Sequence, residues 1–197
     1  MKFIPHDYQS YCTEYIKTHP VAALFSGYGL GLRKDRYHID GHQRPYAGDL
    51  RGQQGLIIAP LRVARDTWPA EIEKWDHLKG LDISVIVGDV KTRIAAVHHP
   101  AMIYIVNREN IKWLVEYYEK NGMRWDFGMV VIDELSSFKS WQTKRFKALM
   151  KVRPFVKRIV GLTGTPSSNG LMDLFAEFKV LDMGKRLGRF IGQYREC

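Results

Sequence analysis

Short apolar runs alternate along the chain with longer amphipathic stretches. Six runs are apolar at consecutive positions and rich in Val and Ile, which is typical of strands buried on both faces of a parallel sheet. These expected strands are Val21–Phe25, Leu56–Ala59, Ile83–Val87, Met102–Val106, Met129–Ile132 and Arg158–Leu162. Expected helices are Tyr8–Thr18, Thr67–Trp75, Glu109–Lys120, Gln142–Lys151 and Leu171–Leu181. This order predicts an α/β fold with a mainly parallel sheet flanked by helices.

One segment breaks the pattern. Residues 33–55, where a helix should join the first two strands, hold four glycines and a proline and have no helical apolar period. Gly and Pro disfavour a continuous helix, and long loops without structure of their own are uncommon inside compact domains. The segment is therefore aberrant for the fold that the rest of the chain predicts.

The length and charge of the chain set further bounds. Its 197 residues are enough for one sizeable domain, and a hydrophobic share of 45% allows a real core. Lys and Arg number 30 against 21 Asp and Glu, which gives a net charge of +9. That excess suits a polyanion such as DNA or RNA, although charge alone is equally compatible with a merely basic globular protein.

The two cysteines and the N-terminus bear on the compartment. Cys12 and Cys197 lie near opposite ends of the chain without metal-ligand spacing, which favours a reducing cytoplasm. The segment Met1–Asp7 is too polar for a signal peptide. No apolar run approaches the roughly 20 residues that a membrane span needs.

Chemistry is first suggested by the run Met129–Glu134, where an apolar strand ends in two adjacent carboxylates. In open α/β sheets, ligands bind outside the carboxyl ends of the strands. Asp133 could there hold the Mg²⁺ of a nucleotide, and Glu134 could orient or deprotonate the attacking water. The alternative is an ordinary strand that ends in a polar turn.

A second strand, Arg158–Leu162, ends in the sequence Thr163-Gly164-Thr165-Pro166. Hydroxyl groups at that edge could sense the neighbouring acidic pair and a bound phosphate. Gly and Pro also punctuate ordinary turns, so a plain strand-to-loop turn is the alternative. The order and spacing of this element after the acidic strand favour the functional interpretation.

Together these segments resemble a known family. Asp133–Lys139 resembles the Walker B, or DEAD/DEAH-box, motif of superfamily-two helicases, nearest to Swi/Snf-like translocases and their phage relatives. Leu162–Gly170 resembles motif III of that family, and Leu56–Trp75 is similar to its motif Ia. Ile105–Asn110 takes the place of motif Ib, and His6–Gln9 resembles the tyrosine-glutamine motif that reads adenine.

The resemblance implies a three-layer RecA-like P-loop fold. Residues 1–182 would be the first, ATP-binding lobe of a DNA-dependent helicase or translocase, with 27–55 aberrant, and residues 183–197 would begin the link to a second lobe. ATP and Mg²⁺ are the implied cofactors. DNA is the implied partner, with RNA still open, and the location is the cytoplasm, that of the host if the protein is phage-encoded.

The resemblance also implies roles for individual residues. Gln9 would bind adenine, Asp133 would hold Mg²⁺, Glu134 would activate water, and Thr163 and Thr165 would couple hydrolysis to motion. The implied residues for catalysis are Asp133, Glu134, Thr163 and Thr165; for nucleotide Gln9, Gly29, Gly31 and Lys34; for metal Asp133; and for the nucleic-acid backbone Pro60, Arg62 and Asn107. Single residues such as Gln9 and Arg62 have ordinary surface roles as their alternative.

The phosphate-binding loop departs from the family pattern. A Walker A loop cradles phosphates with glycine backbone N–H groups and ends in Gly-Lys-Ser/Thr. This chain has the glycines, but Arg33 stands where Gly is needed and Asp35 where a hydroxyl is needed. An aspartate beside a triphosphate is electrostatically unfavourable.

A shift of reading frame would explain both departures. Codons AGG-AAA-GAC-CGT for Arg33–Arg36, read from the second base, give Gly-Lys-Thr-Val, and the shifted frame permits an amphipathic helix up to Gln54. Our hypothesis is that about residues 27–55 are out of frame, through a sequencing error or compensating indels. The rival explanation is a divergent loop that keeps Lys34 near the phosphates.

Three functions are compatible with these features. The first is an ATP-hydrolysing motor component; because no second lobe follows, we expect a truncated product that alone binds nucleotide weakly and does not translocate. The second is a catalytically dead nucleic-acid-binding or interaction module derived from the same family. The third is an unrelated P-loop protein such as a small kinase, against which the element Thr163–Pro166 and the lack of a lid segment argue.

Overall fold

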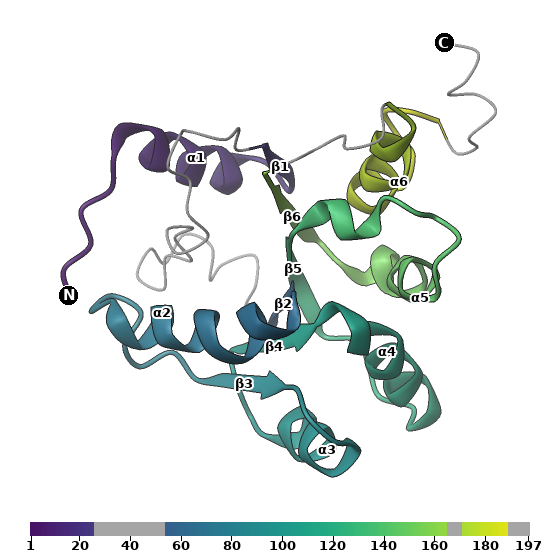
Figure 1. The fold of residues 1–197 in the computed structure, drawn as a ribbon, viewed down its shortest axis with the longest axis horizontal. Helices are drawn as coiled ribbons and strands as arrows, with labels where there is room; N and C mark the ends of the chain where they lie inside the picture. Colours follow the sequence, from purple (N-terminus) through teal and green to yellow (C-terminus); the bar gives the residue numbers. More distant parts are fainter. Residues whose placement is uncertain (26–53, 165–170, 189–197) are drawn as a thin grey trace.

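Six parallel strands form one sheet in the order β1-β6-β5-β2-β4-β3 (Figure 1). The computed structural model describes residues 1–25, 54–164 and 171–188. The strands are β1 (Val21–Phe25), β2 (Gln54–Ala59), β3 (Ile83–Ile86), β4 (Ile103–Asn107), β5 (Phe127–Asp133) and β6 (Arg158–Thr163). The parallel α/β architecture expected from the sequence is confirmed.

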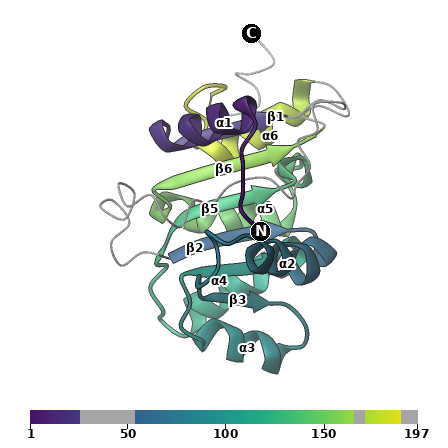
Figure 2. The ribbon, with the colours of Figure 1, turned by 90° about the vertical axis from the view of Figure 1, so that its left-hand side faces the viewer.

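Helices cover both faces of this sheet and make three layers (Figures 1 and 2). One face carries α1 (Asp7–Thr18) and α2 (Trp68–Lys74), with the π-helix η2 (Val63–Thr67) leading into α2. The other face carries α3 (Val90–His98), α4 (Ile111–Lys120), α5 (Lys144–Val152) and α6 (Leu171–Asp182). Short 3-10 helices are η3 (Arg108–Asn110), η4 (Leu135–Phe138) and η5 (Arg153–Phe155).

The core consists of two apolar clusters, one on each side of the sheet. Successive side chains of a strand point to opposite faces, so in β2 Ile58 joins the cluster under α3 to α6, and Ile57 joins the cluster under α1 and α2. The central strands must therefore be apolar at every position, which is the pattern seen in the sequence. Both side chains are at most 1% exposed.

Local signals fix where several helices begin. Asp89 accepts the backbone N–H of Thr92 at 2.7 Å and caps α3, and the Thr143 hydroxyl accepts the N–H of Phe146 at 3.3 Å and caps α5. Such caps satisfy backbone donors that have no partner within the helix. Pro69 lies in the first turn of α2, where its missing N–H costs nothing.

Every expected strand and helix is present, with ends that differ by at most two residues. Two differences have a clear physical reason. Met102, expected to begin a strand, is 58% exposed and precedes β4. Helix α3 was not expected, because among its residues only Val97 is fully buried and its apolar period is weak. The signal that marks it is the capping pair Asp89 and Thr92, followed by His99 and Pro100 after its end.

Within the described residues, no helix combines the length and apolar character needed to cross a membrane.

Candidate functional site

All strands run in the same direction, so their carboxyl ends meet at one edge of the sheet. That edge holds Phe25 at the end of β1, Asp133 at the end of β5 and Thr163 at the end of β6. Strand β6 lies between the other two, and its register places Thr163 opposite Phe25 and Leu162 opposite Asp133. The acidic pair, Thr163 and the end of β1 therefore share one edge of the sheet.

Glu134 is held in an uncommon backbone conformation. Its φ of 84° and ψ of 70° lie in the left-handed region, which non-glycine residues seldom adopt and which clusters at functional sites. Its backbone N–H donates to the Leu162 carbonyl at 2.9 Å. Its Oε1 accepts the hydroxyl of Thr163 at 2.8 Å and that of Ser136 at 2.5 Å. The carboxylate is thus fixed in direction beside β6.

Asp133 is buried, with 2% of its surface exposed. Its Oδ2 accepts a hydrogen bond of 3.1 Å from the indole Nε1–H of Trp68, which comes from the far end of the π-helix. Among the described residues, no three His, Cys, Asp or Glu side chains gather into a metal cage. One carboxylate at a strand end still suits Mg²⁺, which keeps several waters and binds through one or two carboxylates plus phosphates.

A further carboxyl group lies behind this edge, on α6. Glu177 has no exposed surface, and within the part of the chain that the structure describes neither of its carboxyl oxygens has a hydrogen-bond partner. Burial raises its pKa to about 8, and the negative charges of Asp173 and Glu134 add to the rise, whereas Lys139 opposes it. Lys139 is paired with Asp173 at 3.8 Å. The protonated, neutral form of Glu177 is therefore favoured at pH 7, a feature that the sequence did not indicate.

Gln9 lies in the first turn of α1, and 4% of its surface is exposed. Its Oε1 accepts the backbone N–H of His6 at 2.8 Å in a capping box. Its amide Nε2, also buried, has no hydrogen-bond partner among the described residues. A buried donor without a partner is costly in a folded chain, so this amide suits a ligand that supplies an acceptor.

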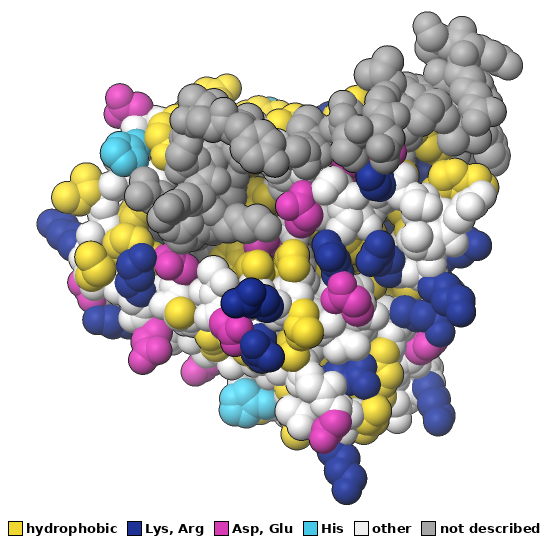
Figure 3. All heavy atoms as spheres, in the orientation of Figure 1, with side chains coloured by type: hydrophobic (Ala, Val, Ile, Leu, Met, Phe, Trp, Pro, Cys, Tyr) yellow, Lys and Arg dark blue, Asp and Glu magenta, His cyan; other side chains and the backbone are white. Residues whose placement is uncertain are grey.

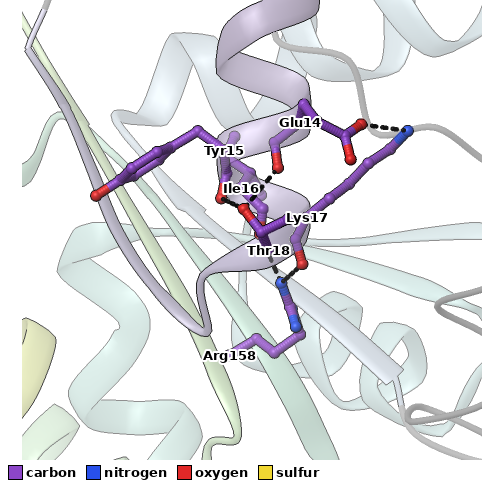
Figure 4. Close-up of polar contacts among 6 residues, drawn as sticks. All are labelled: Glu14, Tyr15, Ile16, Lys17, Thr18 and Arg158. Carbon is purple, nitrogen blue, oxygen red and sulfur yellow. Dashed lines mark hydrogen bonds and ion pairs between the residues drawn. The ribbon is translucent and has the colours of Figure 1, made fainter.

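Arg158 fastens α1 to the sheet (Figure 4). From the first position of β6, its Nη2 donates to the carbonyls of Ile16 at 2.5 Å and Lys17 at 2.9 Å. A cation at the C-terminus of a helix satisfies the last carbonyls and complements the helix dipole. Helix α1, and with it Gln9, is thereby anchored to the strand that ends in Thr163.

The residues expected at the nucleic acid differ in accessibility. Pro60 follows β2 directly and is half-buried, with its carbonyl accepting the N–H of Ala64 at 2.8 Å. Arg62 is exposed two residues further on. Asn107 is only 5% exposed, and its amide is occupied by Glu109 Oε2 at 2.9 Å and by the Asn110 amide at 2.6 Å. Of the three, Arg62 is the one that reaches solvent.

Four expected site residues lie outside the described residues: Gly29, Gly31 and Lys34 of the glycine-rich loop, and Thr165 after β6. Gln54 and Gly55, the last residues of the aberrant segment, belong to β2, where the register with β5 shifts between them. The hypothesis that the residues before β2 are read out of frame is tested by the nucleotide sequence of the gene.

Basic side chains also gather away from this edge, over α4 and α5 on the right-hand side of the face in Figure 3. Several of them are paired: Lys112 contacts Glu116 at 2.9 Å, and Lys151 contacts Glu119 at 3.0 Å. Exposed pairs of this kind contribute little to stability and dilute the local positive charge. The basic side chains over α4 and α5 are therefore partly neutralised by acidic neighbours.

The chain matches the SNF2-related domain family over residues 12–187. It is 37% identical over 193 residues to putative protein p41 of Acyrthosiphon pisum secondary endosymbiont phage 1, which covers 95% of this chain and 41% of that protein. It is 30% identical over 123 residues to the SWI/SNF-related matrix-associated actin-dependent regulator of chromatin subfamily A-like protein 1 of Bos taurus, covering 62% of this chain and 12% of that protein.

A solved structure shares the fold. The Sulfolobus solfataricus SWI2/SNF2 ATPase core in complex with dsDNA superposes with a TM-score of 0.70 at 23% identity, over 100% of this chain and 39% of that one. The chain thus spans about two fifths of the phage relative and of this ATPase core.

Proposed function

Because the chain belongs to the SNF2-related domain family, as a Swi/Snf-like helicase lobe of superfamily two, we propose that it binds and hydrolyses ATP as the first lobe of a DNA-dependent translocase. The observation that carries the proposal is the contact between Thr163 and Glu134. It joins two motifs at the sheet edge where β1 leads into the glycine-rich segment.

In the proposed reaction each residue of the edge has a separate task. Asp133 would hold Mg²⁺, which when bound neutralises charge on the phosphates. Glu134, fixed by Thr163 and Ser136, would accept a proton from the attacking water. Gln9 would donate its Nε2–H to an acceptor on adenine. Gly29, Gly31 and Lys34 would meet the phosphates, and Thr165 would respond to their loss.

DNA is the partner that the structural relative and the charge together support. The structural relative is an ATPase core in complex with dsDNA, and a net charge of +9 on this chain suits a polyanion. We assign the direct phosphate contact to exposed Arg62, next to Pro60. Since Asn107 is buried in its own network, its role would be to shape the turn that follows β4 rather than to touch the backbone.

The boundaries follow from the same assignment. Residues 1–182 would form the lobe and 183–197 the start of a link to a second RecA-like lobe, which would close over the nucleotide and supply charge to the transition state. The chain would act in the cytoplasm, that of the host if it is phage-encoded.

A second candidate function has one observation in its favour. Arg33 and Asp35 replace the Gly and hydroxyl of a phosphate loop, which favours a lobe that binds DNA but does not turn over ATP. Salt-sensitive DNA binding without hydrolysis would identify this module.

The test is ATP hydrolysis with and without duplex DNA, measured on the full-length gene product. We expect DNA-stimulated turnover that falls at least about a hundredfold in Glu134→Gln, because the amide cannot accept the proton. The matched control is Glu116→Gln, which makes the same change on the exposed surface of α4 and should leave turnover intact. Turnover that survives in Glu134→Gln would refute the assigned role.

A further inference from the structure

Trp68 lies between the Asp133 carboxylate, proposed to hold Mg²⁺, and the segment around Arg62, proposed to touch DNA. Its side chain is 6% exposed, and its indole donates to Asp133, a residue 65 positions away that is 2% exposed. An indole has a single donor and no acceptor, so this bond fixes the ring and the carboxylate together. Hydrogen bonds to a charged group away from water are among the stronger ones in proteins.

The backbone around Trp68 explains how the ring reaches the sheet edge. Its backbone N–H donates to the carbonyl of Val63, five residues earlier, which is the π-helical pattern. Trp68 itself is the first residue of α2, and Pro69, which has no N–H, follows it in the first turn. A π-turn inserts an additional residue into a helix, turns the following side chains to a new direction and is frequent at functional sites.

The same turn begins at the segment proposed to touch DNA. The carbonyl of Pro60 accepts the N–H of Ala64 at 2.8 Å, and exposed Arg62 lies between them. One backbone hydrogen bond therefore joins Ala64 to Pro60 and another joins Trp68 to Val63, so the π-turn connects the segment at Arg62 with the residue whose indole contacts Asp133.

We propose that Trp68 is a positioning residue, whose indole holds the Asp133 carboxylate and ties it to the DNA-contacting segment around Arg62. The inference rests on the proposed function for its consequence, though not for the bond itself. Partners that orient a metal ligand typically alter metal affinity by about 10- to 100-fold when removed.

The first test observes the bond directly, by NMR of the chain labelled with ¹⁵N in its five tryptophans. Trp68→Phe identifies the Trp68 indole signal. We expect that signal to be protected from hydrogen exchange and to move when Asp133→Asn weakens the acceptor. The Trp75 indole, which donates to Glu71 at 2.7 Å, is the internal control and should not move. A Trp68 signal that ignores Asp133→Asn would overturn the inference.

The second test measures how the bond from Trp68 affects the Mg²⁺ requirement of ATP hydrolysis. The Mg²⁺ concentration for half-maximal DNA-stimulated hydrolysis should rise about tenfold or more in Trp68→Phe. It should stay unchanged in Trp75→Phe, which removes an indole hydrogen bond at the other end of α2. Equal Mg²⁺ requirements in wild type and Trp68→Phe would overturn the positioning role. A wild type without hydrolysis would refute the proposed activity instead, while the indole signals would still decide whether Trp68 holds Asp133.

Discussion

The Thr163 hydroxyl donates to Glu134 Oε1 at 2.8 Å, across 29 residues of chain and from the neighbouring strand. The bond orients the carboxylate assigned to the attacking water, and it originates on β6, which runs between β1 and β5. A change at the end of β6 would therefore alter the direction of the general base.

Replacing Thr163 tests that dependence. Thr163→Val keeps the shape but removes the hydroxyl, and we expect DNA-stimulated kcat to fall by about tenfold to a hundredfold, because a misdirected base is a poor one. Thr163→Ser, which retains the hydroxyl, should recover most of the loss. Steady-state kinetics of the two variants measures the difference. An unchanged kcat in Thr163→Val, or a loss in Thr163→Ser as large as that in Thr163→Val, would contradict the role given to the hydroxyl.

Glu177→Gln should stabilise the protein at neutral and alkaline pH. Below about pH 4.5 the carboxyl is protonated in both states. Between that value and the folded-state pKa of about 8, the unfolded chain releases the proton while the folded protein keeps it, so the free energy of unfolding falls as pH rises. The amide lacks this penalty, and we expect a gain of about 2–4 kcal/mol at pH 7.5.

Urea unfolding from pH 4 to pH 9 checks the effect of Glu177. The wild type should lose stability relative to Glu177→Gln over the interval from pH 4.5 to 8, and the two curves should run parallel above it. Glu119→Gln, on the exposed surface of α4, provides the matched change without burial. A constant difference across the whole range would show that Glu177 does not titrate between those values.

Gly161 in β6 leaves little room for a larger side chain. An added Cβ would lie 2.8 Å from Leu135 Cδ2 and 3.2 Å from Leu181 Cδ2, so Gly161→Ala should cost about 1–3 kcal/mol through overpacking. Gly55→Ala in β2 is the control, since its nearest neighbours would be 3.8 Å away. Thermal unfolding of both variants measures the difference. An equal effect in both would show that the close contacts with Leu135 and Leu181 do not determine the cost at residue 161.

Arg62 should contribute one phosphate contact. Arg62→Ala is expected to weaken binding to duplexes of any sequence and to lower the slope of log K against log salt by about 1. Arg124, 85% exposed in its side chain and just before β5 at the opposite edge of the sheet, carries the same charge. Arg124→Ala should leave the slope unchanged, so a comparable loss in both variants would mean that net charge alone drives binding.

The nucleotide sequence of the gene tests the frame of residues 27–55. If the segment is out of frame, the bases that encode Arg33–Arg36 give Gly-Lys-Thr when read one base later, and the original frame resumes before β2. A gene that yields no Gly-Lys-Thr in either shifted frame would leave the divergent loop as the explanation. Sequencing across residues 25–56 is sufficient.

The strands could be predicted because they are buried on both faces and therefore apolar throughout. Helix α3 could not be predicted from the sequence. It lies at the margin of the sheet with one buried residue, Val97, so its apolar periodicity is weak. The position of β6 between β1 and β5 also has no local signature, since strand order results from how the connections pack rather than from any single segment.

Some features of the candidate site could likewise be predicted from the sequence, and others could not. Asp133, Glu134 and Thr163 could be predicted because each follows an apolar run and parallel strands end at one edge. The bond from Trp68 to Asp133 and the burial of Glu177 could not be, because both depend on contacts between elements distant in sequence. Asn107 follows the expected strand, but its enclosure by Glu109 and Asn110 appears only in three dimensions.

Strand β1 pairs, within the described residues, with β6 alone. During synthesis β1 therefore has no neighbouring strand until residues 158–163 have been made. Synthesis of the chain between the two strands takes about 7 to 28 s at ordinary elongation rates. Throughout that interval α1 and β1 remain without their docking surface on the ribosome-bound chain, and Arg158 is the residue whose arrival anchors them. The nucleotide edge would thus be the last part of the lobe to assemble, and nascent chains stopped before Arg158 would present an unpaired apolar strand to chaperones.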